Sequence, residues 1–152
     1  MRVAALHDIH GHLPALRAVL DELGRQDVEQ IVIGGDVLPG PMPAETLACV
    51  TDISIPVQFI HGNGDRVVLA HMAGQPIDEV PEQFRESIHW TAERVSAKDR
   101  TWLGSWPPTC RIEVDELGEV LFCHATPRND TECFTRLTAA DRLHGLRFHC
   151  VC

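Results

Sequence analysis

Short apolar runs that alternate with helical patterns fill the first 60 residues and constrain the fold most. Strands are predicted over residues 2–6, 31–33 and 57–60, with helices over 13–23 and 44–51 between them. Strands that alternate with helices in this way form βαβ units, in which the strands run parallel. The sequence therefore predicts an α/β fold that begins with a parallel sheet.

The pattern changes after the third predicted strand. Helices are predicted over residues 66–73 and 82–104, and the apolar runs 110–114 and 119–123 flank a turn that is typical of an antiparallel hairpin. After the hairpin the organisation weakens, and only a short helix over 138–143 is predicted. A sheet that ends in this way is topologically unfinished.

The composition is that of an acidic globular protein, with 44% hydrophobic residues and a formal net charge of −9. A single domain over residues 1–152 is expected from this length. The net charge would repel nucleic-acid phosphates, so a nucleic-acid partner is not expected. No signal peptide is recognisable, and no apolar stretch reaches the roughly 20 residues that cross a bilayer. For this reason we expect no membrane partner. The six cysteines show no disulfide spacing, so we expect a cytoplasmic protein.

Polar residues with metal-binding side chains follow the predicted strands closely: Asp8, His10, Asp36, Asn63 and His124. Each motif alone is also typical of a turn or a helix cap, but together they are expected to meet at one edge of the sheet. Two carboxylates, two imidazoles and an amide suit manganese, iron or zinc better than calcium. Asp36 could bridge two ions, which at roughly 3.5–4 Å apart form the clamp used in phosphoester hydrolysis.

The series Asp8-x-His10, Gly35-Asp36, Gly62-Asn63-x-Asp65 and His124 resembles the calcineurin-like metallophosphoesterase superfamily. It is most similar to the small bacterial and archaeal phosphodiesterases of that superfamily, and the likeness extends from residue 1 to about residue 142. The resemblance implies a four-layer αββα sandwich whose C-terminal strands are incomplete here. It also implies a dinuclear site at the edges of the two sheets.

By this resemblance Asp8, His10 and Asp36 hold one divalent ion, and Asp36, Asn63 and His124 hold the other. The implied ions are manganese, with iron, zinc, nickel and magnesium as alternatives. The implied reaction is hydrolysis of a small phosphodiester by a metal-bridging hydroxide, with Asp36, Asn63 and His124 as the catalytic residues.

Three further residues receive supporting roles. The resemblance implies that Asp65 orients the Asn63 region without binding metal. Arg128 could bind a phosphate with two parallel hydrogen bonds, and His12 could touch the substrate. For Arg128 and His12 the alternative is an ordinary exposed loop residue.

Two departures from the family pattern leave an alternative open. Gly64 stands where many members have a histidine that helps to protonate the leaving group. The Gly-His-x-His motif that supplies one histidine to each ion is absent, and residues 143–152 form an atypical tail. We expect a chain that is truncated or frame-shifted before that motif. A catalytically impaired fragment that acts as a binding module is the alternative, and a homodimer in which a partner donates ligands is a further one.

Overall fold

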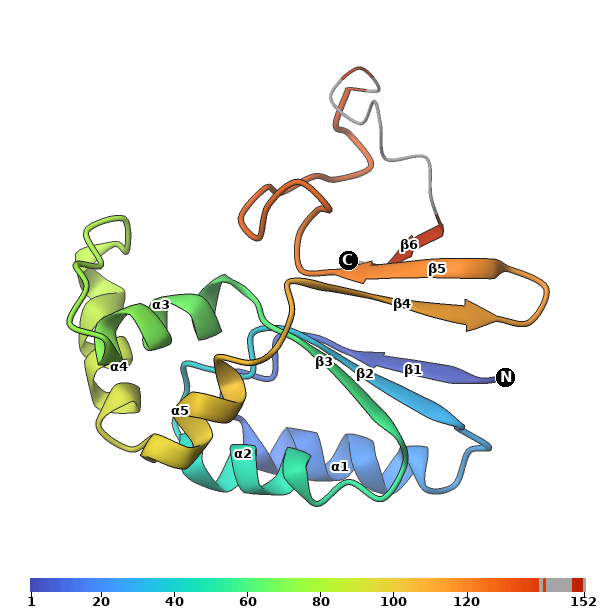
Figure 1. Ribbon diagram of the computed structural model, residues 1–152, viewed down its shortest axis with the longest axis horizontal. Coiled ribbons are helices and arrows are strands. Elements are labelled where there is room, and N and C mark those ends of the chain that lie inside the picture. Colours follow the sequence, from blue (N-terminus) through green and yellow to red (C-terminus); the bar gives the residue numbers. More distant parts are fainter. Residues whose placement is uncertain (140, 142–148, 152) are drawn as a thin grey trace.

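Three parallel strands form the first sheet of the computed structural model, which describes residues 1–139, 141 and 149–151. The order across this sheet is β1 (Val3–Leu6), β2 (Gln30–Gly34) and β3 (Val57–Ile60). The connections are α1 (Leu13–Leu23) and α2 (Pro43–Thr51), which lie on the same face of the sheet (Figure 1). The predicted βαβ units are therefore confirmed, with boundaries within two residues of those expected.

The alternating side chains of these strands separate two apolar layers. Leu6, Ile33 and Phe59 are register partners and belong to the core between the sheet and the helices. Val32 and Ile60 point the other way and pack against the second sheet. Because a parallel sheet of this kind is covered on both faces, its central strand is apolar at nearly every position.

The second sheet begins with the predicted hairpin, β4 (Thr109–Val114) and β5 (Gly118–Cys123). The backbone of β6 (His149–Val151) pairs with β5 in parallel. Figure 1 shows the two sheets stacked, with α1, α2 and α5 on the outer face of the first sheet. The mixed α/β fold is confirmed, and within the described residues it comprises one helical layer and two sheets.

Two helix predictions needed correction. The helix α3 (Asn63–Met72) begins three residues before the predicted start, directly after Gly62. The single helix predicted over 82–104 is two helices, α4 (Glu82–Ala92) and α5 (Ala97–Leu103). The second of these starts because the Ser96 hydroxyl accepts a hydrogen bond from the Asp99 N–H at 3.1 Å, which caps a new helix.

The longest described helices have 11 residues, and none in that part of the chain is long and apolar enough to span a membrane. The end of the chain is described only in part. Of the predicted helix over 138–143 the structure describes residues 138, 139 and 141, and 138 and 139 are not helical. Of the atypical tail over 143–152 it describes only the backbone of β6.

Candidate metal centre

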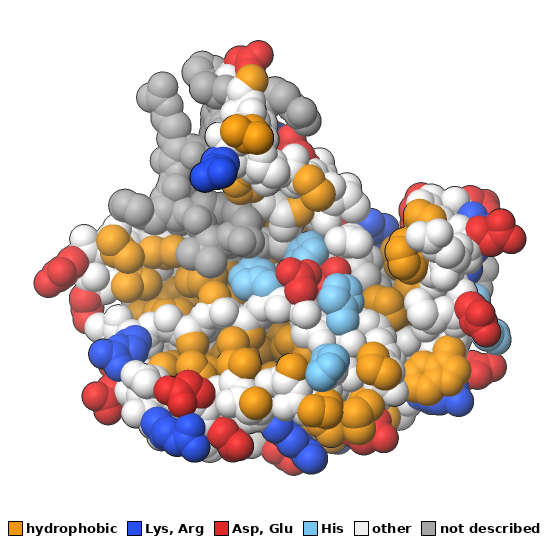
Figure 2. All heavy atoms as spheres, turned by 180° about the vertical axis from the view of Figure 1, so that it is seen from behind, with side chains coloured by type: hydrophobic (Ala, Val, Ile, Leu, Met, Phe, Trp, Pro, Cys, Tyr) orange, Lys and Arg blue, Asp and Glu red, His pale blue; other side chains and the backbone are white. Residues whose placement is uncertain are grey.

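The side chains predicted to bind metal lie at the carboxyl ends of four strands. Asp8 and His10 follow β1, Asp36 follows β2, and Asn63 opens α3 just after β3. His124 follows β5 of the second sheet, so this group comes from both sheets. Figure 2 shows histidine and acidic side chains gathered at the centre of one face of the molecule, with hydrophobic side chains around them.

The backbone around this cluster is unusual, because three of its residues have a positive φ. The values are +54° for Asp8, +46° for His10 and +53° for Asp36, a region in which L-residues are rarely found. Backbone hydrogen bonds hold the loops after β1 and β2 together. Among them, the His10 N–H donates to the Asp36 carbonyl at 2.9 Å, and the Gly11 N–H to the Val37 carbonyl at 2.8 Å. Strain of this kind persists where the surroundings enforce it, which is common at functional sites.

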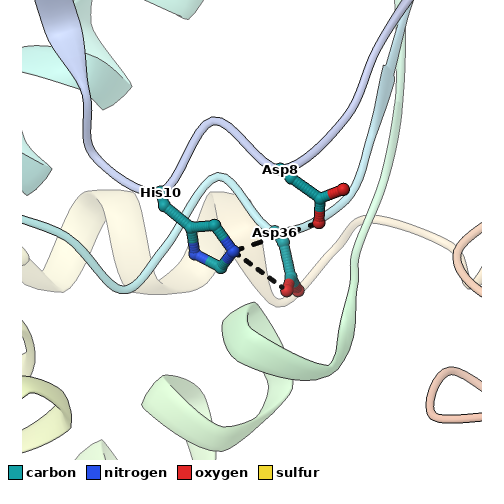
Figure 3. Close-up of side chains that lie close together, drawn as sticks. All are labelled: Asp8, His10 and Asp36. Atoms are coloured by element: carbon teal, nitrogen blue, oxygen red, sulfur yellow. Dashed lines mark ion pairs between the residues drawn. The ribbon is translucent and has the colours of Figure 1, made fainter. Parts of the chain in front are cut away.

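His10 presents one ring nitrogen to two carboxylates (Figure 3). Its Nδ1 lies 3.3 Å from the Pro39 carbonyl oxygen, which can only accept, so Nδ1 carries the hydrogen. In the neutral ring Nε2 then carries the lone pair. That atom lies 3.9 Å from Asp8 Oδ1 and 3.6 Å from Asp36 Oδ2. One ligand atom from each of the three side chains falls within 4.8 Å of the others.

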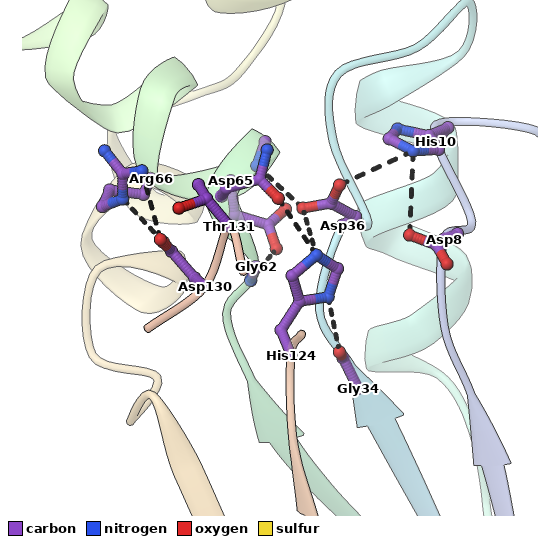
Figure 4. A network of polar contacts seen from close by, with 12 residues as sticks. Asp8, His10, Gly34, Asp36, Gly62, Asp65, Arg66, His124, Asp130 and Thr131 are labelled. Atoms are coloured by element: carbon purple, nitrogen blue, oxygen red, sulfur yellow. Dashed lines mark hydrogen bonds and ion pairs between the residues drawn. The ribbon is translucent and has the colours of Figure 1, made fainter. Parts of the chain in front are cut away.

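His124 has the same arrangement on the other side of Asp36 (Figure 4). Its Nδ1 lies 3.1 Å from the Gly34 carbonyl, so the hydrogen is again on Nδ1. Its Nε2 lies 3.1 Å from Asn63 Oδ1 and 3.6 Å from Asp36 Oδ1. The two oxygens of the Asp36 carboxylate therefore face one histidine each.

This donor set fits divalent cations. Two imidazole lone pairs converge on carboxylate and amide oxygens, and acceptors that face one another without a donor repel. A cation between them turns the repulsion into coordination. Each histidine is also oriented by a carbonyl on its other nitrogen, the supporting contact that metal-binding histidines normally make. Asp8, His10 and Asp36 can hold one ion, and Asp36, Asn63 and His124 can hold a second, with Asp36 between the two groups.

Burial raises the pKa of Asp36 above its ordinary value, against the attraction of His124 and the Gly64 N–H bond. That N–H donates to Asp36 Oδ1 at 2.7 Å from the first turn of α3. The side chain is only 7% exposed, so its negative charge has little water to stabilise it. A bound cation would supply that stabilisation.

Asp65 connects the segments that carry Asp36 and Asn63. Its carboxylate is fully buried and accepts from the Leu38 N–H at 2.9 Å and the Gly62 N–H at 3.0 Å. Burial raises its pKa to about 7, although both hydrogen bonds oppose the shift. No metal-facing contact of Asp65 is among those of the described residues, and the orienting role expected for it stays a prediction.

An ion pair beside the site was not predicted from the sequence. Arg66 of α3 donates from Nε to Asp130 Oδ2 at 2.6 Å and from Nη2 to Oδ1 at 3.3 Å. This pair joins α3, which begins with Asn63, to the loop that follows His124 (Figure 4). Arg66 stands three positions after Asn63 on one helix, so the helical spacing could have indicated that both side chains share a face.

The remaining predicted residues lie in other contacts. His12 caps α1, where its Nδ1 accepts from the Ala15 N–H at 3.2 Å. The Arg128 guanidinium pairs with Glu132, at 2.8 Å from Nε and 2.7 Å from Nη2. The substrate-binding roles of His12 and Arg128 stay predictions.

A family model described as the calcineurin-like phosphoesterase superfamily domain matches residues 1–144. The fold and the strand-end cluster thus have a common explanation, and the chain belongs to the calcineurin-like phosphoesterase superfamily.

Individual proteins similar to this chain include one that is described as a metallophosphoesterase. The chain is 29% identical over 129 residues to the uncharacterized protein MJ0912 of Methanocaldococcus jannaschii, covering 84% of this chain and 50% of that protein. It is similar to the crystal structure of a metallophosphoesterase from Sphaerobacter thermophilus, with a TM-score of 0.60 and 30% identity over 86% of this chain and 49% of that one.

The crystal structure of the hypothetical protein PH1004 from Pyrococcus horikoshii OT3 has a TM-score of 0.76 at 20% identity, over 88% of this chain and 58% of that one, and shows a shared fold. The chain thus spans about half the length of the relatives it matches.

Proposed function

We propose that the chain hydrolyses phosphodiesters at a centre of two divalent ions, with manganese as the preferred metal. One observation carries this proposal: the Asp36 carboxylate has its Oδ2 3.6 Å from His10 Nε2 and its Oδ1 3.6 Å from His124 Nε2. A single carboxylate between two histidine-containing groups is an arrangement that can hold a pair of ions. Two bound ions supply an activated water and neutralise the charge that develops on the phosphate oxygens.

The residues of the chain then have separate tasks. Asp8 and His10 from the first sheet hold one side of the centre, and Asn63 and His124 hold the other. The positive end of the α3 dipole at Asn63 faces the same space, which favours a negatively charged phosphate there.

Gly64 bears on the leaving group of the proposed substrate. A glycine at this position offers no side chain to protonate a leaving group beside Asn63. A leaving group that departs readily as an anion is therefore favoured.

Hydrolysis of bis-p-nitrophenyl phosphate by the manganese-loaded protein tests the proposal. Asp36→Asn should lower kcat/KM by about 100-fold or more, because the ligand shared by both ions loses its charge. Asp52→Asn, which changes an exposed carboxylate at the end of α2, is the matched control and should leave the rate unchanged.

Equal rates for Asp36→Asn and the unaltered protein would overturn the proposal. Tight manganese binding without turnover would favour the alternative of a binding module. A higher kcat/KM for p-nitrophenyl phosphate than for the diester would show that monoesters are preferred.

A further inference from the structure

A cleft of about 520 Å³ lies beside the metal centre, between α3 and α4. Its lining includes His10, Asp36 and Asn63, so the cleft and the metal centre are continuous. This volume is within the range of small-molecule sites, roughly 300–1,000 Å³. A phosphoester held at the metal centre would therefore have room for its organic group here.

Apolar side chains form one wall of the cleft. Val67 of α3 and Ile88 of α4 are buried beneath it, whereas Phe84 of α4 is 53% exposed. Phe84 and Ile88 are four residues apart on α4, a spacing that puts both on one face of the helix, yet only Ile88 is buried. Phe84 lies one turn before Ile88, where α4 extends beyond the apolar core, so its ring faces the cleft and solvent. A flat apolar ligand group could stack on that ring.

The polar side chains of the cleft supply mainly acceptors. Glu79 contributes a carboxylate, which lies 3.8 Å from Arg66 Nη1. The Ser87 hydroxyl donates to the Phe84 carbonyl at 2.7 Å, so its oxygen lone pairs remain to accept. The Arg66 guanidinium is engaged by Asp130 through Nε and Nη2 and forms an ion pair with Glu79 through Nη1. A ligand that satisfies this wall must bring N–H donors, and a second phosphate would be repelled by Glu79.

We propose that this cleft binds the base of a nucleoside phosphoester, with an amino-bearing base stacked on Phe84 and its N–H groups directed to Glu79. The proposal rests on the proposed function, since it assigns the organic group of the same substrate. An acyl chain would satisfy the apolar wall but would make no hydrogen bond with Glu79 or Ser87, so it would match only part of the cleft lining.

Equilibrium binding, which requires no turnover, tests this assignment. Adenosine 5′-monophosphate and ribose 5-phosphate carry the same phosphate and differ by the base. Calorimetry on the manganese-loaded protein should show tighter binding of the nucleotide. Stacking of a base on an aromatic ring corresponds to about five- to 150-fold in affinity.

Phe84→Ala should lower the ratio of the affinity for the nucleotide to that for ribose 5-phosphate by at least about fivefold, and Phe84→Tyr should keep the ratio of the unaltered protein. Because Phe84 is exposed, its truncation leaves the apolar core intact. Phe134→Ala is the matched control: Phe134 is 42% exposed and lines a different cleft, on the side of Asp8 and His124.

Equal affinities of the unaltered protein for the nucleotide and for ribose 5-phosphate would overturn the assignment of the cleft. So would a preference that is lost in Phe134→Ala and kept in Phe84→Ala. If the nucleotide preference is present while bis-p-nitrophenyl phosphate is not hydrolysed, the cleft assignment holds and the proposed function fails. If bis-p-nitrophenyl phosphate is hydrolysed but the nucleotide and ribose 5-phosphate bind equally, the proposed function holds and the cleft assignment fails.

Discussion

A methyl group added at Gly62 would occupy space that Asp36 now fills. A Cβ at this position would lie 2.2 Å from Asp36 Oδ1 and 2.6 Å from its backbone nitrogen. The backbone of Gly62 has φ −99° and ψ −176°, a conformation that alanine adopts readily. Gly62→Ala is therefore a steric perturbation alone, applied to the carboxylate that faces both histidines.

The size of the effect follows from these contacts. Ordinary contact requires at least 3.4 Å, so Asp36 Oδ1 must move by about 1 Å. Rotation of the Asp36 side chain alone would not relieve the clash, because the added Cβ also meets the Asp36 backbone nitrogen. Overpacking of this kind costs about 1–3 kcal/mol of unfolding free energy. A ligand displaced by about 1 Å should also weaken manganese binding by about tenfold or more and lower turnover by up to about 100-fold.

Two measurements check this: urea denaturation followed by tryptophan fluorescence, and calorimetric titration with manganese. Gly24→Ala is the matched control, because Gly24 ends α1 with φ −64° and its nearest added contact is 3.6 Å. We expect the control to bind manganese normally and to be as stable as the unaltered protein or slightly more so. Unchanged manganese affinity in Gly62→Ala would refute the reasoning that Asp36 binds the metal from the position that Gly62 leaves free.

Two further predictions concern stability. Manganese at about 100 times its dissociation constant should raise the unfolding free energy by about 2.7 kcal/mol per site, which corresponds to about 5–10 °C in Tm. An equal rise in Tm for Asp36→Asn would contradict the assignment of Asp36 as a metal ligand. Burial would raise the pKa of Asp130, but its hydrogen bonds to Arg66 hold it below the usual 3.8. A carboxyl whose pKa is lowered by folding stabilises the native state above pH 3.8 and loses this effect as the pH falls through its native pKa. The difference in unfolding free energy between the unaltered protein and Arg66→Gln, measured by urea denaturation, should therefore be largest at pH 6 and decrease below pH about 4. A difference that increases on acidification would contradict this.

Residues at the strand ends were identifiable from the sequence because local signals place them. Apolar runs such as Ile31–Ile33 define where a buried strand ends, and a polar residue just beyond, such as Asp36, lies at that end of the strand. The parallel order of the strands then brings these ends to one edge of the sheet. For this reason the fold class and the convergence of Asp8, His10 and Asp36 followed from local pattern alone.

Contacts between segments far apart in the chain were decided only by the tertiary structure. Arg66 and Asp130 are 64 positions apart, and no local sequence pattern indicates that they form a pair. Phe84 has the spacing of a core residue, yet it is exposed because the path of α4 carries it past the edge of the core. Local periodicity reports which face of a helix is apolar, whereas burial depends on what packs against that face. The strand ends of this protein thus follow from its sequence, and the cleft beside them follows from how its helices pack.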